Sequence, residues 1–259
     1  MIGWVFLAIA FVGGAVAFAV AGALVSRTLI RHHVAEGHND VLVPIFLTAG
    51  VIYAVLLGFM VVAMWEAYDG AHANTAEEAS LLVPLYRQTE VIAPEKGVAM
   101  RGLIRTYAED AIKGWPKFQT TGQGSPEARV TVDSMLKLYA TLTPATKVRE
   151  LAATQFLDTL SQMLLDRNKR LLQASESLSW VMWLAAVGGG MVTVGMSFVL
   201  YMDKPRPQAV MTSVLAALIG VLLFIMAVFN HPFQGPLAIT PEPFESSIKL
   251  FDQIDGDFR

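Results

Sequence analysis

Four long apolar runs constrain this chain more than any other feature of its sequence. None of the four has Asp, Glu, Lys, Arg or His in its interior, and they cover Ile2–Val25, Val41–Trp65, Trp180–Met202 and Val210–Phe229. A helix needs about 20 apolar residues to cross the hydrocarbon core of a membrane. Because a backbone in lipid must satisfy its own hydrogen bonds, each run is expected to be a spanning helix.

The composition agrees with that expectation and excludes several classes of protein. Hydrophobic residues make up 54% of the chain and charged residues 16%, against about 25% charged residues in soluble domains. The net charge of −3 includes no basic cluster, so we expect no nucleic-acid partner. With no cysteine, the chain forms no disulfide. The first run lacks a basic segment before it, which favours an uncleaved span over a signal peptide.

The spacing of the runs predicts the fold class and the domain organisation. The chain is expected to be an all-α, polytopic membrane protein with four transmembrane helices in two hairpins. Residues 1–65 would form the first hairpin and residues 180–229 the second. A helical extramembrane segment at residues 66–179 would lie between helices two and three, and residues 230–259 would form a C-terminal extramembrane tail.

Prolines suited to the first turn of a helix divide the middle segment. Residues 66–91 are expected to continue span two as a helix that bends near Pro84. Ser125 and Thr143 each precede such a proline and are natural N-caps. This pattern predicts three further helices, at residues 95–117, 126–142 and 144–176.

Basic residues near the spans predict how the chain is oriented in the cell inner membrane. The two short loops carry Arg27, Arg31, Lys204 and Arg206. The stretch Glu66–Tyr86 has no Lys or Arg and carries four acids. Because cytoplasmic loops are rich in Lys and Arg, the short loops are expected in the cytoplasm, with both termini and the helical segment outside. The basic residues just before span three favour the opposite orientation, and these are Arg167, Lys169 and Arg170.

Span two carries a stripe of residues that share one helix face. The stripe is apolar through the membrane and becomes acidic where the helix leaves it, and consists of Ile45, Thr48, Ile52, Val55, Phe59, Val62, Glu66 and Asp69. A ring of such helices would form an apolar neck lined by Ile52, Val55, Phe59 and Val62, with Glu66 and Asp69 as a cation-binding mouth. The alternative is that the apolar residues face lipid and the acids are simply solvated.

Two clusters of polar residues could hold a metal ion. Three histidines, His32, His33 and His38, lie in the first short loop, and imidazole suits zinc, copper or nickel. Their spacing matches no structural zinc pattern, so the alternative is a polar or pH-sensitive loop. A second cluster could bind calcium, although a solvated helix face is the favoured interpretation: Glu66, Asp69, His72, Glu77 and Glu78.

Catalytic signatures are missing from the sequence. No H-E-x-x-H, G-x-S-x-G or phosphate-binding glycine loop occurs, and the spans carry no ionisable residue inside the membrane. We therefore expect no enzyme and no cofactor. The expected partners are the lipid bilayer, inorganic ions and further copies of the chain in a homo-oligomer, because small residues at Gly13, Ala17 and Ala21 let helices approach closely.

The stretch Leu57–Asp69 resembles the second transmembrane helix of bestrophins, in which Leu-Gly-Phe precedes a Trp-containing polar exit. The whole chain is similar to a bacterial bestrophin-like domain family of membrane proteins. The similar stretches follow in order along the chain and include Ala76–Ser80, Leu85–Arg87, Leu103–Ala108, Trp115–Pro116, Arg167–Leu171, Pro232–Gly235 and Thr240–Phe244.

Bestrophins are oligomeric ion channels with four spanning helices per subunit, and span two lines an apolar neck. The resemblance implies that Phe59 and Val62, with Val55, belong to such a neck. Met64 stands where bestrophins usually have Arg. Their middle segment is cytosolic, which is opposite to the orientation that the basic residues predict. Two functions follow: a homo-oligomeric ion channel that leans towards cations, or a non-conducting membrane scaffold or sensor whose helical segment binds a partner protein or ligand.

Overall fold

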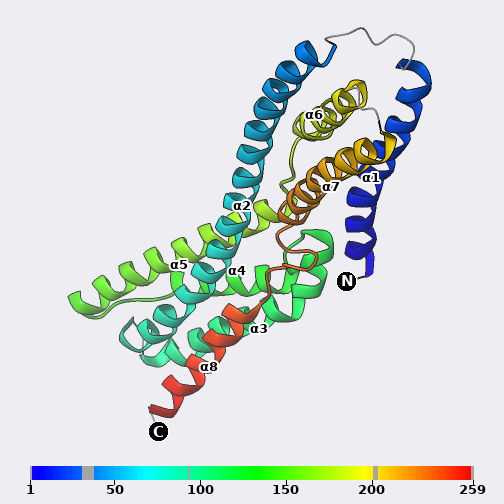
Figure 1. Cartoon of the computed structure of the whole chain (residues 1–259). Helices are drawn as coiled ribbons and strands as arrows, with labels where there is room; N and C mark the ends of the chain where they lie inside the picture. The colour runs from blue at the N-terminus through cyan, green and yellow to red at the C-terminus, as the bar shows by residue number, and fades with distance from the viewer. Residues whose placement is uncertain (1, 31–37, 93, 201–203, 258–259) are drawn as a thin grey trace. The chain divides into compact units, whose positions relative to one another are not determined.

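The computed structural model describes residues 2–30, 38–92, 94–200 and 204–257, and every regular element in these ranges is an α-helix (Figure 1). This result confirms the predicted all-α class. In chain order the helices are α1 (Ile2–Ile30), α2 (His38–Ile92), α3 (Pro94–Thr121), α4 (Pro126–Ala140), α5 (Lys147–Ser175), α6 (Trp180–Val199), α7 (Pro205–Phe229) and α8 (Glu242–Asp257).

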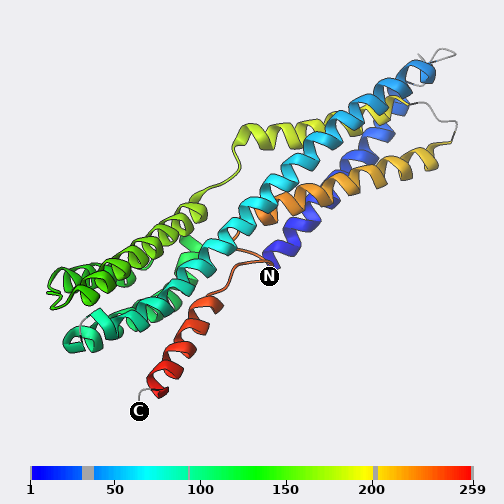
Figure 2. The same ribbon diagram turned by 90° about the vertical axis from the view of Figure 1, so that its left-hand side faces the viewer.

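Four of these helices are long and apolar enough to cross a membrane, as the sequence predicted. The candidate spans are Gly3–Ser26 in α1, the apolar part of α2, Trp180–Val199 in α6 and Arg206–Phe229 in α7. Helix α2 is 55 residues long, so it continues well beyond its apolar part, and Figure 2 shows it as one unbroken ribbon. The helix runs through Pro84, which confirms the expected continuation of span two, and the expected bend near Pro84 stays a prediction.

The chain forms two compact units, each built from two separate stretches of sequence. Unit 1 comprises Met1–Tyr68 and Ser177–His231, and unit 2 comprises Asp69–Glu176 and Pro232–Arg259. The boundary falls within α2, so this helix contributes residues to both units.

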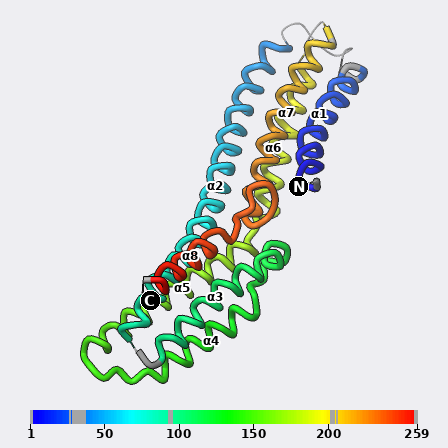
Figure 3. Tube along the Cα trace, turned by 90° about the horizontal axis from the view of Figure 1, so that it is seen from below, coloured from blue at the N-terminus to red at the C-terminus, as the bar shows by residue number. Residues whose placement is uncertain are grey.

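In unit 1, helices α1, α6 and α7 lie side by side, as Figures 1 and 3 show. Tyr53 of α2 packs against them, and its hydroxyl donates a hydrogen bond to the Ala186 carbonyl at 2.8 Å. Glycines in α6 make room for the ring, since a Cβ at Gly189 would stand 2.6 Å from a Tyr53 carbon. A Cβ at Gly220 of α7 would stand 2.9 Å from the backbone oxygen of Phe11, so α1 and α7 touch backbone to backbone.

In unit 2, the continuation of α2 packs with α3, α4, α5 and α8 around a core of large side chains. Residues that are almost completely buried come from each of these five helices and include Leu82, Leu85, Ile104, Tyr107, Met135, Phe156, Leu160, Phe244 and Phe251. The unit therefore has its own hydrophobic core and needs both of its stretches of sequence to complete it.

Helix α8 occupies the region that the sequence analysis treated as a tail without a named element. Its apolar residues recur at helical spacing, and Phe244, Phe251 and Ile254 are all buried in unit 2. Ser247 fixes the helix further, because its hydroxyl donates to the Ala79 carbonyl of α2 at 2.8 Å.

Helix ends in the middle segment agree only in part with the prediction. Ser125 is the N-cap of α4, and its hydroxyl accepts a hydrogen bond from Ala128 N at 3.2 Å. The predicted start of the next helix at Pro144 is wrong, because α5 begins at Lys147. Thr146 caps that helix instead of Thr143, with its hydroxyl accepting from Arg149 N at 3.3 Å. A threonine directly before the first turn can satisfy that amide, whereas Pro144 lies three residues before α5 begins.

Candidate functional site

Helix α2 presents two different faces within unit 1. Tyr53, Leu57 and Met60 lie on one face and are buried in a cluster with apolar residues of α1, α6 and α7. On a helix that turns about 100° per residue, positions 52, 55, 59 and 62 fall on roughly the opposite side. The packed face therefore leaves the predicted stripe pointing away from the other spans.

The predicted pore-lining residues are all exposed in the single chain. The exposed fractions are 66% for Ile52, 53% for Val55, 73% for Phe59 and 49% for Val62. Apolar residues beside the stripe, such as Val51 at 63%, are exposed as well. The structure thus brings the four residues onto one uncovered face, and their role as a pore lining stays a prediction.

Two carboxylates stand where α2 leaves its apolar run. Glu66 and Asp69 are exposed, three residues apart on the same helix. Neither takes part in an ion pair among the described residues. Both acids are therefore free to meet ions in solution, and their role at a pore mouth stays a prediction.

The histidine loop lies largely outside the described residues, and these include neither His32 nor His33. His38 opens α2, with its Nε2 atom 3.3 Å from the Val199 carbonyl of α6. In the described ranges no three His, Cys, Asp or Glu side chains come together to hold a metal ion. The metal hypothesis for the three histidines stays untested.

The acidic stretch of α2 contains one residue that the sequence analysis misjudged. Glu78 was expected on a solvated helix face, but it is completely buried in unit 2. Its Oε2 atom accepts from Arg170 Nε at 2.6 Å, and its Oε1 atom accepts from Arg170 Nη2 at 3.0 Å. The two charges are 92 residues apart in sequence and form a bidentate ion pair between α2 and α5.

Aromatic rings enclose the guanidinium of Arg170. Its Cζ atom lies 5.2 Å from the ring centre of Trp115, 4.8 Å from that of Phe118 and 5.7 Å from that of Phe244. Burial lowers the pKa of Arg170, but the charge and hydrogen bonds of Glu78 outweigh burial and raise that pKa above its ordinary value. Arg170 therefore remains charged and joins helices α2, α3, α5 and α8.

Tyr107 of α3 completes the contacts of Glu78. Its hydroxyl donates to Glu78 Oε1 at 2.5 Å. Burial, together with the negative charge of Glu78, raises the pKa of Tyr107 well above its ordinary value. We call Glu78, Tyr107, Arg170 and the three surrounding rings the charged core of unit 2. Glu78 accepts three hydrogen bonds, and these compensate the free-energy cost of burying its charge.

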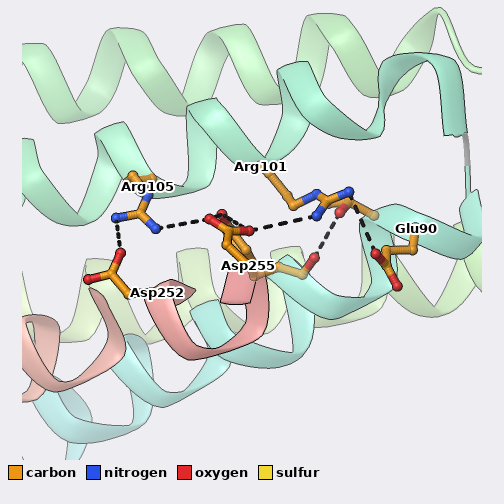
Figure 4. A network of polar contacts seen from close by, with 7 residues as sticks. Glu90, Arg101, Arg105, Asp252 and Asp255 are labelled. Carbon is orange, nitrogen blue, oxygen red and sulfur yellow. Dashed lines mark hydrogen bonds and ion pairs between the residues drawn. The ribbon is translucent and has the colours of Figure 1, made fainter. Parts of the chain in front are cut away.

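A second polar network ties α8 to α3 at the surface of unit 2 (Figure 4). Arg105 forms ion pairs with Asp252 at 2.8 Å and with Asp255 at 3.2 Å. Arg101 lies 3.7 Å from Asp255, and the Tyr86 hydroxyl donates to the same carboxylate at 2.8 Å. The Asp255 side chain is 41% exposed, so water reaches this network more than the charged core and it holds α8 less strongly.

Sequence reasoning missed the charged core because its ion pair joins residues far apart in the chain. One signal did point to it: the stretches that resemble the bestrophin-like family. Glu78 lies in Ala76–Ser80, Tyr107 in Leu103–Ala108 and Arg170 in Arg167–Leu171. Trp115 and Phe244 fall in two further such stretches, so these parts of the sequence meet at one place in the fold.

The fold and these features define the class of the protein as an all-helical membrane protein with four candidate spans and a separate helical unit. The sequence matches the Bestrophin-like domain family over residues 13–244, and the chain belongs to this family. The resemblance drawn from the sequence is thereby confirmed.

A solved structure shares the fold across almost its whole length. The crystal structure of a mutated bacterial Bestrophin homolog from Klebsiella pneumoniae superposes with a TM-score of 0.73. The match covers 94% of this chain and 98% of that one, at 11% sequence identity. No curated protein sequence matches this chain.

Proposed function

We propose that the protein is a homo-oligomeric ion channel in which α2 lines an apolar neck that opens into an acidic mouth. The observation that carries the proposal is the free face of α2. Ile52, Val55, Phe59 and Val62 are exposed opposite the face that packs in unit 1, and the same helix then presents Glu66. Membership of the Bestrophin-like family supports the proposal.

The chemistry of the α2 face favours cations. An apolar constriction can gate by losing its water, and a ring of carboxylates concentrates cations at its entrance. Each subunit would contribute Glu66 and Asp69 to that ring. Met64 adds no positive charge at the exit, where bestrophins usually have Arg. The neck and the mouth together would give a cation-selective pore that conducts only when water fills the apolar neck.

Self-assembly would place copies of α2 around a common axis in the lipid of a cell inner membrane, as a multi-pass protein. The short loops would face the cytoplasm, with the termini and unit 2 outside. A single cysteine at Thr120, in a chain without other cysteines, should react with a membrane-impermeant maleimide added outside intact cells. Reaction only after lysis would reverse the orientation.

The channel proposal is tested by recording from the purified full chain in planar bilayers. We expect discrete currents whose reversal potential in a salt gradient lies on the cation side of zero. Absence of current across a range of pH, calcium and voltage would reject the proposal.

The acidic mouth is tested by Glu66→Gln with Asp69→Asn, which should move the reversal potential towards zero. The matched control is Asp133→Asn with Asp158→Asn, which removes the same charge from exposed positions on α4 and α5. If both double variants behave like the wild type, these two acids have no part in selectivity.

A non-conducting scaffold or sensor is the second candidate. The observation in its favour is that unit 2 builds a complete core of its own, as a binding module would. Co-purification of the full chain with a partner in fixed stoichiometry, together with silent bilayers, would favour this alternative.

A further inference from the structure

A half-open groove of about 250 Å³ runs along unit 1 between α1 and α6, with α7 as its floor. The floor is buried, whereas residues on the two walls are exposed at the rim. Every lining side chain is apolar or is the hydrogen of a glycine. The floor includes Ala216, Ile219 and Leu223, and the rim includes Ala10, Gly14 and Met191.

The groove exists because small residues face it. A Cβ built at Gly14 of α1 meets no atom within 4 Å, so the wall is hollow there. On the opposite wall, Gly190 lies so close to the floor that a Cβ would stand 3.1 Å from Ile219. The backbone contact at Gly220 holds α1 against α7, which leaves the open space between α1 and α6.

Aromatic side chains stand near the two ends of the groove. Phe198 of α6 packs onto Gly22, where a Cβ would overlap the ring. Towards the start of α1, Phe11 stacks on Trp183 with ring centres 6.2 Å apart. These contacts join α1 to α6 on either side of the open stretch and give the groove a limited length.

The surroundings of the groove are expected to be hydrocarbon. The lining residues of α1 run from Ala10 to Phe18, in the middle of the candidate span Gly3–Ser26. At about 1.5 Å per residue, this stretch is about 12 Å long. Because this stretch lies in the middle of the span, the groove extends about 6 Å to either side of the midplane of a core about 30 Å thick. The methyl-terminal parts of acyl chains lie at this depth.

We propose that the groove binds one acyl chain of a membrane lipid. Apolar voids of about 150 Å³ stay free of water and take up hydrocarbon ligands, so this larger apolar space also suits a hydrocarbon. An acyl chain is about as thin as one side chain, so it can occupy a slot whose depth comes from missing side chains, whereas a helix with its side chains is about 10–12 Å wide. The proposal goes beyond ion conduction and does not depend on it.

The test uses the purified full chain in vesicles of phosphatidylethanolamine and phosphatidylglycerol. A trace of phosphatidylglycerol carries a photoactivatable diazirine on one acyl chain, and cross-linked residues are located by mass spectrometry. Met191, at the rim, should be labelled several-fold more than its neighbour Val192, which is also exposed but does not line the groove. Equal labelling of the two residues would overturn the proposal.

Filling the groove gives the second measurement. Gly14→Leu should reduce labelling of Met191 several-fold, because the new side chain occupies the hollow wall. Gly50→Leu on α2 is the matched control, since a Cβ there also meets no atom within 4 Å and the residue lies outside the groove. Unchanged labelling in Gly14→Leu would overturn it. If Gly14→Leu does not fold, the comparison of Met191 with Val192 still decides.

Discussion

The two units hold their helices together by different means. Unit 1 relies on close approach, with Gly189 and Gly220 letting a ring and a backbone come near, and Tyr53 provides a hydrogen bond to a backbone carbonyl. Unit 2 relies on a buried ion pair between Glu78 and Arg170 within aromatic rings. The same helix, α2, takes part in both arrangements.

The difference follows from the solvent that each unit faces. Lipid tails are as apolar as leucine, so helices in a membrane gain little from burying apolar surface and depend on tight packing of small residues. In water, burial of large side chains drives association, and a buried charge is tolerated when its hydrogen bonds are satisfied. Substitutions should therefore damage the units in different ways, and four of them test this contrast.

The largest effect is expected for Arg170→Met. This change leaves Glu78 charged and buried without its partner, which should lower the free energy of unfolding of unit 2 by about 3–5 kcal/mol. Pulse proteolysis of the full chain in detergent, over a urea series, measures the loss. Adding Glu78→Leu should recover much of it, because no buried charge then remains. Arg167→Met, three residues away, is the control, and an equal loss there would contradict the special role of the pair.

Tyr107→Phe should cost about 1.5–3 kcal/mol, because it removes a hydrogen bond to a charged group. The folded state keeps the Tyr107 proton, whereas an unfolded tyrosine loses it near pH 10. The stabilisation is thus complete below about pH 10 and declines as pH rises further. The variant should show a shallower alkaline loss of stability than the wild type in urea titrations at several pH values.

Tyr139→Phe is the control for that slope, because the Tyr139 hydroxyl donates to the Ala153 carbonyl and not to a carboxylate. If its alkaline loss of stability is as shallow as that of Tyr107→Phe, the effect does not come from the charged core.

Gly220→Ala should destabilise unit 1 by about 1–3 kcal/mol through overpacking. Its new methyl would lie 2.9 Å from the Phe11 oxygen, so α1 must move away from α7. Gly188→Ala tests the same change where a Cβ meets no atom within 4 Å, and it should leave stability unchanged or slightly raised. Thermal unfolding in detergent measures both. Equal melting temperatures for the two variants would show that backbone contact does not hold unit 1.

The smallest effect is expected for Asp255→Asn. The side chain is 41% exposed, so loss of its ion pairs should cost about 0–1 kcal/mol. Limited trypsin digestion after Lys249 reports loosening of α8 and should speed up slightly in the variant. Asp158→Asn, on an exposed face of α5, should not change the cleavage rate. If Asp255→Asn lowers the free energy of unfolding of unit 2 as much as Arg170→Met does, the surface network, and not the buried pair, stabilises unit 2.

The sequence predicted the four spans because an uncharged run of about 20 residues has few alternatives to a membrane helix. The continuation of α2 and the cap at Ser125 were also predictable, since both depend on local signals. The Glu78–Arg170 pair was not predictable from spacing, because nothing local distinguishes a paired glutamate from a solvated one. Helix α8 was overlooked although Phe244 and Phe251 stand two turns apart.

The exposed face of α2 marks the limit of inference for the candidate site. Periodicity placed Ile52, Val55, Phe59 and Val62 on one face, and the structure exposes them together. Whether lipid or a pore covers that face depends on neighbouring copies, and a spacing pattern within one chain carries no record of them.

The discontinuity of unit 2 has a consequence for how the protein is made. Helices α3, α4 and α5 leave the ribosome before α6 and α7, but α8 follows all four spans. The three rings around Arg170 are complete only once Phe244 has been synthesised, which happens after the second pair of spans. A chain interrupted after α7 would possess the four candidate spans and still carry an open unit 2, because α8 supplies Phe244 and Phe251 to its core.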